Sequence, residues 1–292
     1  MKKEDAQDHL AGGNAHYGEG KFDNAIAEYS EAIKLALNNA LSYYRRGIAY
    51  DSKGEYDNAI ADYTRAIELN PNYAEAYCFR GIAYDGKGEY DNAIADYTRA
   101  IELNPNYALA YCNRGADYNG KGEYDKAIAD FTKVIELVPN EGVAYYNRGI
   151  AHTNKGEYDR AIADFTKTIE LVPNYAEAYC NRGAAYANKE EYDRAIADFT
   201  KAIELDPNDS LAYYNRGIAH DGKDDHNKAI ADYSKAIELN PNYAEAYYNR
   251  GIDYNAQGKN AEAIADLRKC IEISNDPNVV LQAGQMVSKL EQ

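Results

Sequence analysis

Apolar residues along the chain recur at the spacing of amphipathic α-helices. In the segment EYDNAIADYTRAIELNP, for example, one helical face carries Ala59, Ile60, Tyr63, Ala66 and Ile67. The segment opens with acidic residues, carries arginine or lysine in its later half and stops at proline, which complements the helix dipole at both ends. The sequence contains no alternating strand pattern. The pattern therefore predicts an all-helical protein.

A second kind of segment, such as AEAYYNRGIAYDGKG, precedes each of these helices and is also predicted to be helical. It has few β-branched residues and ends at Lys-Gly, where glycine can take the left-handed conformation of a helix cap. The predicted caps are Gly54, Gly88, Gly122, Gly156 and Gly258. Glu190 and Asp224 stand where two further copies would have this glycine. A left-handed conformation there costs about 1 kcal/mol, so we expect these turns to be locally altered.

The two helices form a unit that repeats every 34 residues. One position is glycine in all eight copies: Gly13, Gly47, Gly81, Gly115, Gly149, Gly183, Gly217 and Gly251. One helical hairpin cannot cover its own apolar face, so the units must stack into a solenoid. We therefore expect a single domain over residues 1–292. Its repeats are predicted at about 6–39, 40–73, 74–107, 108–141, 142–175, 176–209, 210–243 and 244–278, with a capping helix at 279–292.

The constant spacing within the unit resembles the tetratricopeptide repeat (TPR) family. The second copy places the residues of the family pattern at Tyr43, Arg46, Gly47, Tyr50, Ala59, Tyr63, Ala66 and Pro71. Two departures are systematic, because tyrosine replaces the first tryptophan of the pattern and arginine replaces the leucine before glycine. The resemblance covers residues 6–278 and implies an all-α, right-handed superhelical solenoid of antiparallel helix pairs.

Charge and composition exclude several classes of partner. The 48 acidic and 32 basic side chains give a formal charge of −16, which disfavours nucleic acid and anionic membrane surfaces. No stretch approaches the ~20 apolar residues of a membrane span. The segment MKKEDAQDHL has no apolar core and is not a signal peptide, although a signal removed earlier stays an alternative. We expect a cytoplasmic protein.

Histidine and cysteine residues give no indication of catalysis or metal binding. His152 and His220 stand where other copies have tyrosine, and His226 likewise replaces a turn tyrosine such as Tyr192, so we interpret these rings as packing residues. No histidine pair has metal-ligand spacing and no Cys-x-x-Cys occurs. Four cysteines without an evident disulfide framework favour a reducing compartment. We expect no enzymatic activity, no cofactor and no metal.

An arginine before the glycine recurs in seven copies, and the second helices supply an acidic residue at one matching position. The arginines are Arg46, Arg80, Arg114, Arg148, Arg182, Arg216 and Arg250, and the acids are Glu28, Asp62, Asp96, Asp130, Asp164, Asp198, Asp232 and Asp266. A partly buried guanidinium needs an acceptor, so we predict a structural ladder of ion pairs, within or between repeats. The alternative is that the arginines bind an anionic ligand.

The resemblance implies that the first helices line a concave groove that binds extended peptides. Five asparagines follow this groove by position: Asn113, Asn147, Asn181, Asn215 and Asn249. They are similar to the asparagine ladders of TPR domains in O-GlcNAc transferases and peroxisomal import receptors. An amide side chain can bridge the N–H and C=O of a passing backbone. The alternative is that asparagine is inherited with each repeat and satisfied by water or neighbouring helices.

Flanking residues on the same face are predicted to set specificity. They are Tyr146, Tyr214, Tyr248, Ile150, Ile218 and Ile252. Rings, aliphatic side chains and scattered acids favour an extended peptide with apolar and basic side chains. We therefore predict a non-enzymatic scaffold or adaptor that binds a protein or peptide in the groove. The alternative is a self-assembling repeat protein that forms dimers or end-to-end oligomers.

Overall fold

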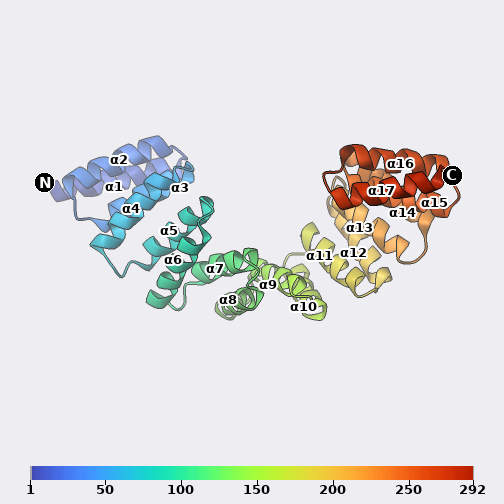
Figure 1. Cartoon of the computed structure of the whole chain (residues 1–292). Coiled ribbons are helices and arrows are strands. Elements are labelled where there is room, and N and C mark those ends of the chain that lie inside the picture. Colours follow the sequence, from blue (N-terminus) through green and yellow to red (C-terminus); the bar gives the residue numbers. More distant parts are fainter. Residues whose placement is uncertain (1, 292) are drawn as a thin grey trace. The chain divides into compact units, whose positions relative to one another are not determined.

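The computed structural model describes residues 2–291, and in that range the chain forms seventeen α-helices and no strand (Figure 1). The first helices of the repeats are α1 (Lys2–Gly18), α3 (Ala40–Ser52), α5 (Ala74–Gly86), α7 (Ala108–Gly120), α9 (Gly142–Asn154), α11 (Ala176–Asn188), α13 (Ser210–Asp221) and α15 (Ala244–Ala256). The second helices are α2 (Phe22–Leu35), α4 (Tyr56–Leu69), α6 (Tyr90–Leu103), α8 (Tyr124–Leu137), α10 (Tyr158–Leu171), α12 (Tyr192–Leu205), α14 (His226–Leu239) and α16 (Asn260–Ile273), and α17 (Pro277–Leu290) follows them. The predicted all-α arrangement of paired helices is confirmed.

The helices divide into two compact units, the first ending at Asn147 and the second beginning at Arg148. In the first unit, each helix from α1 to α8 packs against the next one along the chain. In the second unit, the helices from α10 to α17 do the same (Figure 1). None of the described helices is long and apolar enough to cross a membrane.

The two helices of a repeat approach closely because a glycine faces a buried ring. A Cβ atom at Gly47 would lie only 2.7 Å from the ring of Tyr63, which is completely buried. The same position holds a buried side chain in every repeat: Tyr29, Tyr63, Tyr97, Phe131, Phe165, Phe199, Tyr233 and Leu267. Small and large residues at facing positions thus produce the tight packing of each pair.

The turns between the paired helices keep one conformation throughout the repeats. The five predicted glycine caps have φ values between +73° and +80°. Glu190 and Asp224 adopt the same left-handed conformation, with φ of 61° and 58°. In their turns the backbone hydrogen bond from the next residue is also preserved, for example from Glu191 N to Tyr186 O at 2.9 Å. Our expectation of locally altered turns is therefore wrong, because both turns keep the backbone conformation and the hydrogen bond of the glycine turns.

Replacing Glu190 with glycine is expected to raise the free energy of unfolding by roughly 0.5–1 kcal/mol. The left-handed conformation costs a residue with a Cβ atom ~1–2 kcal/mol, and the greater freedom of glycine in the unfolded chain offsets part of the gain. Urea unfolding measures the change. Lys189→Gly is the control, because Lys189 has φ of −94° and glycine relieves no strain there. This control also removes the ion pairs of Lys189 with Asp159 and Glu191, so it should lower the free energy of unfolding. Equal effects of both substitutions would contradict the assignment of strain to Glu190.

The final helix packs against the last repeat, as predicted, but it begins earlier. Helix α17 starts at Pro277 rather than residue 279, because the Asp276 side chain caps it by accepting a hydrogen bond from Asn278 N at 2.8 Å. Proline suits the first helical position, where its missing N–H is not needed. Ala283 and Val287 are buried against Leu267 and the rest of the last repeat. The helix covers apolar surface that an additional repeat would otherwise cover.

Candidate functional site

The arginine ladder is structural, and its ion pairs form within each repeat. Arg182 donates two parallel hydrogen bonds to Asp198, at 2.7 Å from Nε to Oδ2 and 2.8 Å from Nη2 to Oδ1. Its Nη1 donates to Thr166 Oγ1 of the preceding repeat at 3.0 Å. The same-repeat pairs are Arg46–Asp62, Arg80–Asp96, Arg114–Asp130, Arg148–Asp164, Arg182–Asp198, Arg216–Asp232 and Arg250–Asp266.

These contacts also bear on the alternative role of the arginines as anion ligands. The side chains of Arg182 and Asp198 are only 16% and 9% exposed, and the guanidinium lies 5.7 Å from the centre of the Tyr179 ring. Bidentate pairing with aspartate occupies the guanidinium N–H donors that an anionic ligand would otherwise use. A binding site is therefore expected elsewhere on the first helices.

The predicted asparagines are all half-buried on first helices, Asn113 and Asn147 in the first unit and Asn181, Asn215 and Asn249 in the second. Asn249 Nδ2 donates to Tyr214 Oη at 3.1 Å, and Asn215 Nδ2 lies 3.9 Å from Cys180 Sγ. In both cases the amide nitrogen contacts the first helix of the preceding repeat.

These contacts support one part of our alternative interpretation, in which neighbouring helices satisfy the asparagines. They engage only the amide nitrogen. Among the described residues no hydrogen bond reaches the Oδ1 atom of Asn215 or Asn249, so this oxygen remains an acceptor for a ligand. Asn181 differs, because its Nδ2 donates to Glu177 O of its own helix at 2.9 Å.

The flanking residues divide between packing and exposure. Tyr214 packs against Tyr233 and Tyr243, with ring centroids 5.8 and 4.7 Å apart, and burial raises the pKa of its hydroxyl. Tyr248 Oη donates to Gln282 Oε1 of α17 at 3.4 Å. Ile218 is 38% exposed, whereas the remaining predicted residues, Tyr146, Ile150 and Ile252, are half-buried. Of this set, Ile218 offers the most accessible apolar surface.

A hollow of about 420 Å³ lies between α11 and α13 in the second unit. Asn215 and Ile218 line it, and Asp221 lies at the end of the same helix. Ala184 and Ala187 form the opposite side on α11. Tyr192 and Phe199 of α12, together with Asn188 and Gly222, complete the lining. The hollow thus combines apolar walls with two amides and one carboxylate, and a few polar groups among apolar walls are typical of binding sites.

Two small residues in the sixth repeat explain why the hollow forms there. The equivalents of Ala184 are Asn14, Ile48, Ile82, Ala116, Ile150, Ile218 and Ile252. The equivalents of Ala187 are Tyr17, Asp51, Asp85, Asn119, Thr153, Asp221 and Asn255. The sixth repeat is the one with alanine at both positions. This double reduction in size is the signal in the sequence that marks the hollow, and the groove prediction did not use it.

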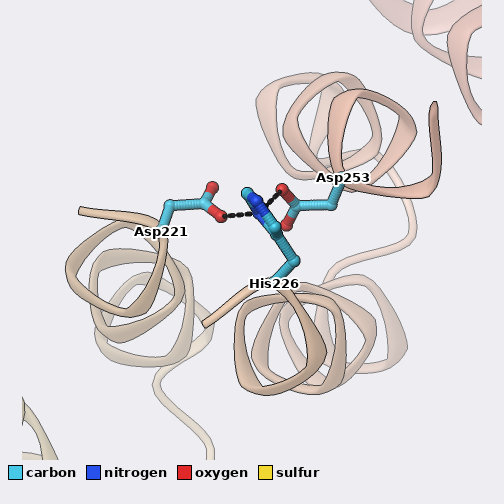
Figure 2. Close-up of side chains that lie close together, drawn as sticks. All are labelled: Asp221, His226 and Asp253. Carbon is cyan, nitrogen blue, oxygen red and sulfur yellow. Dashed lines mark hydrogen bonds and ion pairs between the residues drawn. The ribbon is translucent and has the colours of Figure 1, made fainter. Parts of the chain in front are cut away.

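Asp221 also belongs to a second group of side chains, which the repeat pattern did not bring together. It meets His226 at the start of α14 and Asp253 in the last turn of α15 (Figure 2). We interpreted His226 as a packing ring, but its Nδ1 lies between the two carboxylates. The signal in the sequence was Asp253, an acid at a position where the preceding repeats have Ala151, Ala185 and Ala219.

Several solved structures are similar to the chain. A chain of the APC/C hetero-tetramer Cut9–Hcn1 has 19% identity and a TM-score of 0.63, and the alignment covers 93% of this chain and 53%, about half, of that chain. MamA protein has 33% identity and a TM-score of 0.54, with coverage of 60% and 95%. YrrB, a TPR protein with an unusual peptide-binding site, has 26% identity and a TM-score of 0.53, with coverage of 65% and 97%.

Family comparison covers most of the sequence. No curated protein matches the chain. The tetratricopeptide repeat model matches residues 40–73, 74–107, 108–141, 142–175, 176–209, 210–243 and 244–276, and a second TPR repeat model matches residues 13–53. These matches span far more than half of the sequence. Together with the stacked helix pairs, they establish that the chain belongs to the tetratricopeptide repeat family.

Proposed function

We propose that the protein is a non-enzymatic scaffold that binds an extended peptide across α11 and α13. The hollow between these helices carries the proposal, because it is a concave, mostly apolar surface within one compact unit. Tetratricopeptide repeat proteins are generally protein–protein interaction scaffolds. YrrB, which is similar over part of the chain, supports peptides as the ligand class by analogy.

The lining of the hollow indicates the ligand chemistry. Ile218, Ala184 and Ala187 suit an aliphatic side chain of the peptide. The free Oδ1 of Asn215 can accept a hydrogen bond from a peptide N–H next to that side chain. The net charge of −16 favours basic residues elsewhere in the peptide, because opposite charges speed the encounter.

Replacing Ala184 with isoleucine is expected to weaken peptide binding at least ~10-fold. The larger side chain fills the hollow, and losing the burial of one aliphatic side chain costs ~1.5 kcal/mol or more. Isoleucine stands at this position in five other repeats, so the variant should fold. Peptides selected on the wild type by phage display are tested against both proteins by fluorescence polarisation.

Ala116→Ile provides the matched control, because it makes the same substitution at the equivalent position of the first unit. We expect this variant to bind the selected peptides as the wild type does. Unchanged affinity in Ala184→Ile, or an equal loss of affinity in Ala116→Ile, would contradict the proposed site. Circular dichroism of all three proteins checks that they keep the same helix content.

A further inference from the structure

Three potential metal ligands from two successive repeats meet in the second unit. Asp221 ends α13, His226 begins α14, and Asp253 projects from α15 towards them (Figure 2). His226 Nδ1 lies 2.9 Å from Asp253 Oδ1 and 3.2 Å from Asp221 Oδ1. One donor atom from each residue lies within 4.8 Å of the others. A single ring nitrogen thus faces two carboxylates at once.

Asp253 brings a buried carboxyl oxygen without a hydrogen-bond partner to the cluster. Its side chain is 1% exposed, and its Oδ2 is buried without a hydrogen-bond partner. Among residues 2–291, no lysine or arginine forms an ion pair with Asp221 or Asp253. Buried carboxylates normally have a cation or several donors beside them. The imidazole alone cannot neutralise both.

A second carboxylate pair in the same chain shows what the histidine adds. Asp85 and Asp117 occupy the positions of Asp221 and Asp253 four repeats earlier, and Asp117 is also buried. At the position of His226, however, this pair has Tyr90, which is 49% exposed. The acidic pair therefore recurs, and only the later copy has a third ligand of the kind that metals use.

We propose that Asp221, His226 and Asp253 bind one divalent transition-metal ion of the Zn²⁺ type. Two carboxylate oxygens and one imidazole nitrogen are donors that Zn²⁺, Co²⁺ and Mn²⁺ accept. Mg²⁺ and Ca²⁺ prefer sites made of oxygen ligands alone, and the imidazole disfavours them here. The ion would supply a positive charge beside the buried carboxyl of Asp253.

The geometry needs little adjustment to hold such an ion. Zinc bonds to nitrogen and oxygen are ~2.0–2.1 Å long, so neighbouring ligands of a tetrahedral site lie ~3.3 Å apart. The two measured separations from Nδ1, 2.9 and 3.2 Å, are close to this value. Side chains of Asp221 and His226 are 28% and 37% exposed, which leaves water access to a fourth position.

A neighbouring tyrosine orients one ligand. Tyr233 Oη donates to Asp221 Oδ2 at 2.8 Å, so that Asp221 Oδ1 faces the cluster. Metal ligands are commonly held by such outer hydrogen bonds. Other repeats have phenylalanine at this position, namely Phe131, Phe165 and Phe199. The hydroxyl is therefore not required for packing.

The acidic and imidazole groups of this cluster shift one another's pKa. Burial and the Asp221 carboxyl raise the pKa of Asp253 to about 7, although His226 opposes the shift. Burial alone would lower the pKa of His226, but its hydrogen bonds to Asp221 and Asp253 raise it.

Isothermal titration of tag-free, chelator-treated protein with ZnCl₂ at about pH 7.5 tests the site. The wild type is expected to bind one equivalent. Asp253→Ala and His226→Tyr should each lower the affinity at least ~10-fold, because each removes a ligand. Both substitutions install the residue that other repeats have at that position, so the variants should fold. Tyr233→Phe should lower the affinity about 10-fold while keeping one site.

Two further variants distinguish this site from zinc bound elsewhere. Asp117→Ala removes the acid of the other pair and should leave one equivalent bound. Tyr90→His should complete the Asp85–Asp117 pair and raise the stoichiometry from one to two. A wild type without saturable zinc binding would overturn the proposal. Asp253→Ala and His226→Tyr variants that bind zinc as the wild type does would also overturn it. All variants keep the four free cysteines, so zinc bound by cysteine would not change between them. A Tyr90→His variant that stays at one equivalent would overturn the role of the histidine.

Discussion

Replacing Asp117 with alanine is expected to raise the free energy of unfolding at about pH 8 by roughly 3 kcal/mol. Asp117 is 7% exposed, and its Oδ2 has no hydrogen-bond partner among the described residues. Burial, and then the neighbouring Asp85, raise the pKa of its carboxyl to about 7. Alanine fits the position, because Ala83 and Ala151 are completely buried at the same place in the adjacent repeats.

The gain should depend on pH with a definite sign. A carboxyl in the unfolded chain ionises near pH ~4, whereas the folded protein holds the proton of Asp117 until about pH 7. Between these values the folded state binds more protons, so the stability of the wild type falls as the pH rises. Guanidinium unfolding at about pH 4 and pH 8 measures both limits. A gain of equal size at the two pH values would contradict this explanation.

The sequence was sufficient to predict the helix pairs and the ladder, because both depend on spacing that every repeat enforces. The 34-residue period places Arg182 and Asp198 on adjoining helices in each copy. The spacing alone does not decide whether an arginine pairs with the aspartate of its own repeat or with that of a neighbouring repeat. The structure shows both relations, since the guanidinium pairs with Asp198 in its own repeat and donates to Thr166 in the preceding one.

The candidate sites were harder to predict because they arise where repeats differ. The hollow requires two small side chains on one helix, Ala184 and Ala187, to face Ile218 of the next. The proposed metal site joins residues from three helices, and these residues do not have the sequence spacing of a known metal-binding motif. His226 replaces a tyrosine, and the replacement of one ring by another predicts a packing role. The sequence alone does not show that Asp253 lies beside it. The positions of the candidate sites are therefore indicated by residues that deviate from the repeat consensus, and not by the periodicity itself.

Replacing Arg182 with leucine is expected to lower the free energy of unfolding by roughly 3 kcal/mol. The substitution leaves the Asp198 carboxylate buried without its cation, and breaking a buried ion pair in this way costs ~3–5 kcal/mol. Thr166 also loses the Nη1 donor that connects the two repeats. Guanidinium unfolding measures the loss, and the affinity for selected peptides should change less than stability does.

Two matched variants show whether the unpaired carboxylate is the cause. The double variant Arg182→Leu, Asp198→Ala should be more stable than the single one, because replacing both members of a buried pair is often nearly neutral. Arg194→Leu should change stability by less than ~0.5 kcal/mol, since the Arg194 side chain is 68% exposed in its pair with Glu191. If Arg182→Leu lowered the free energy of unfolding no more than Arg194→Leu does, the ladder would contribute little to stability. That result would favour the alternative that the arginines bind an anion, although their bidentate contact with aspartate argues against this role.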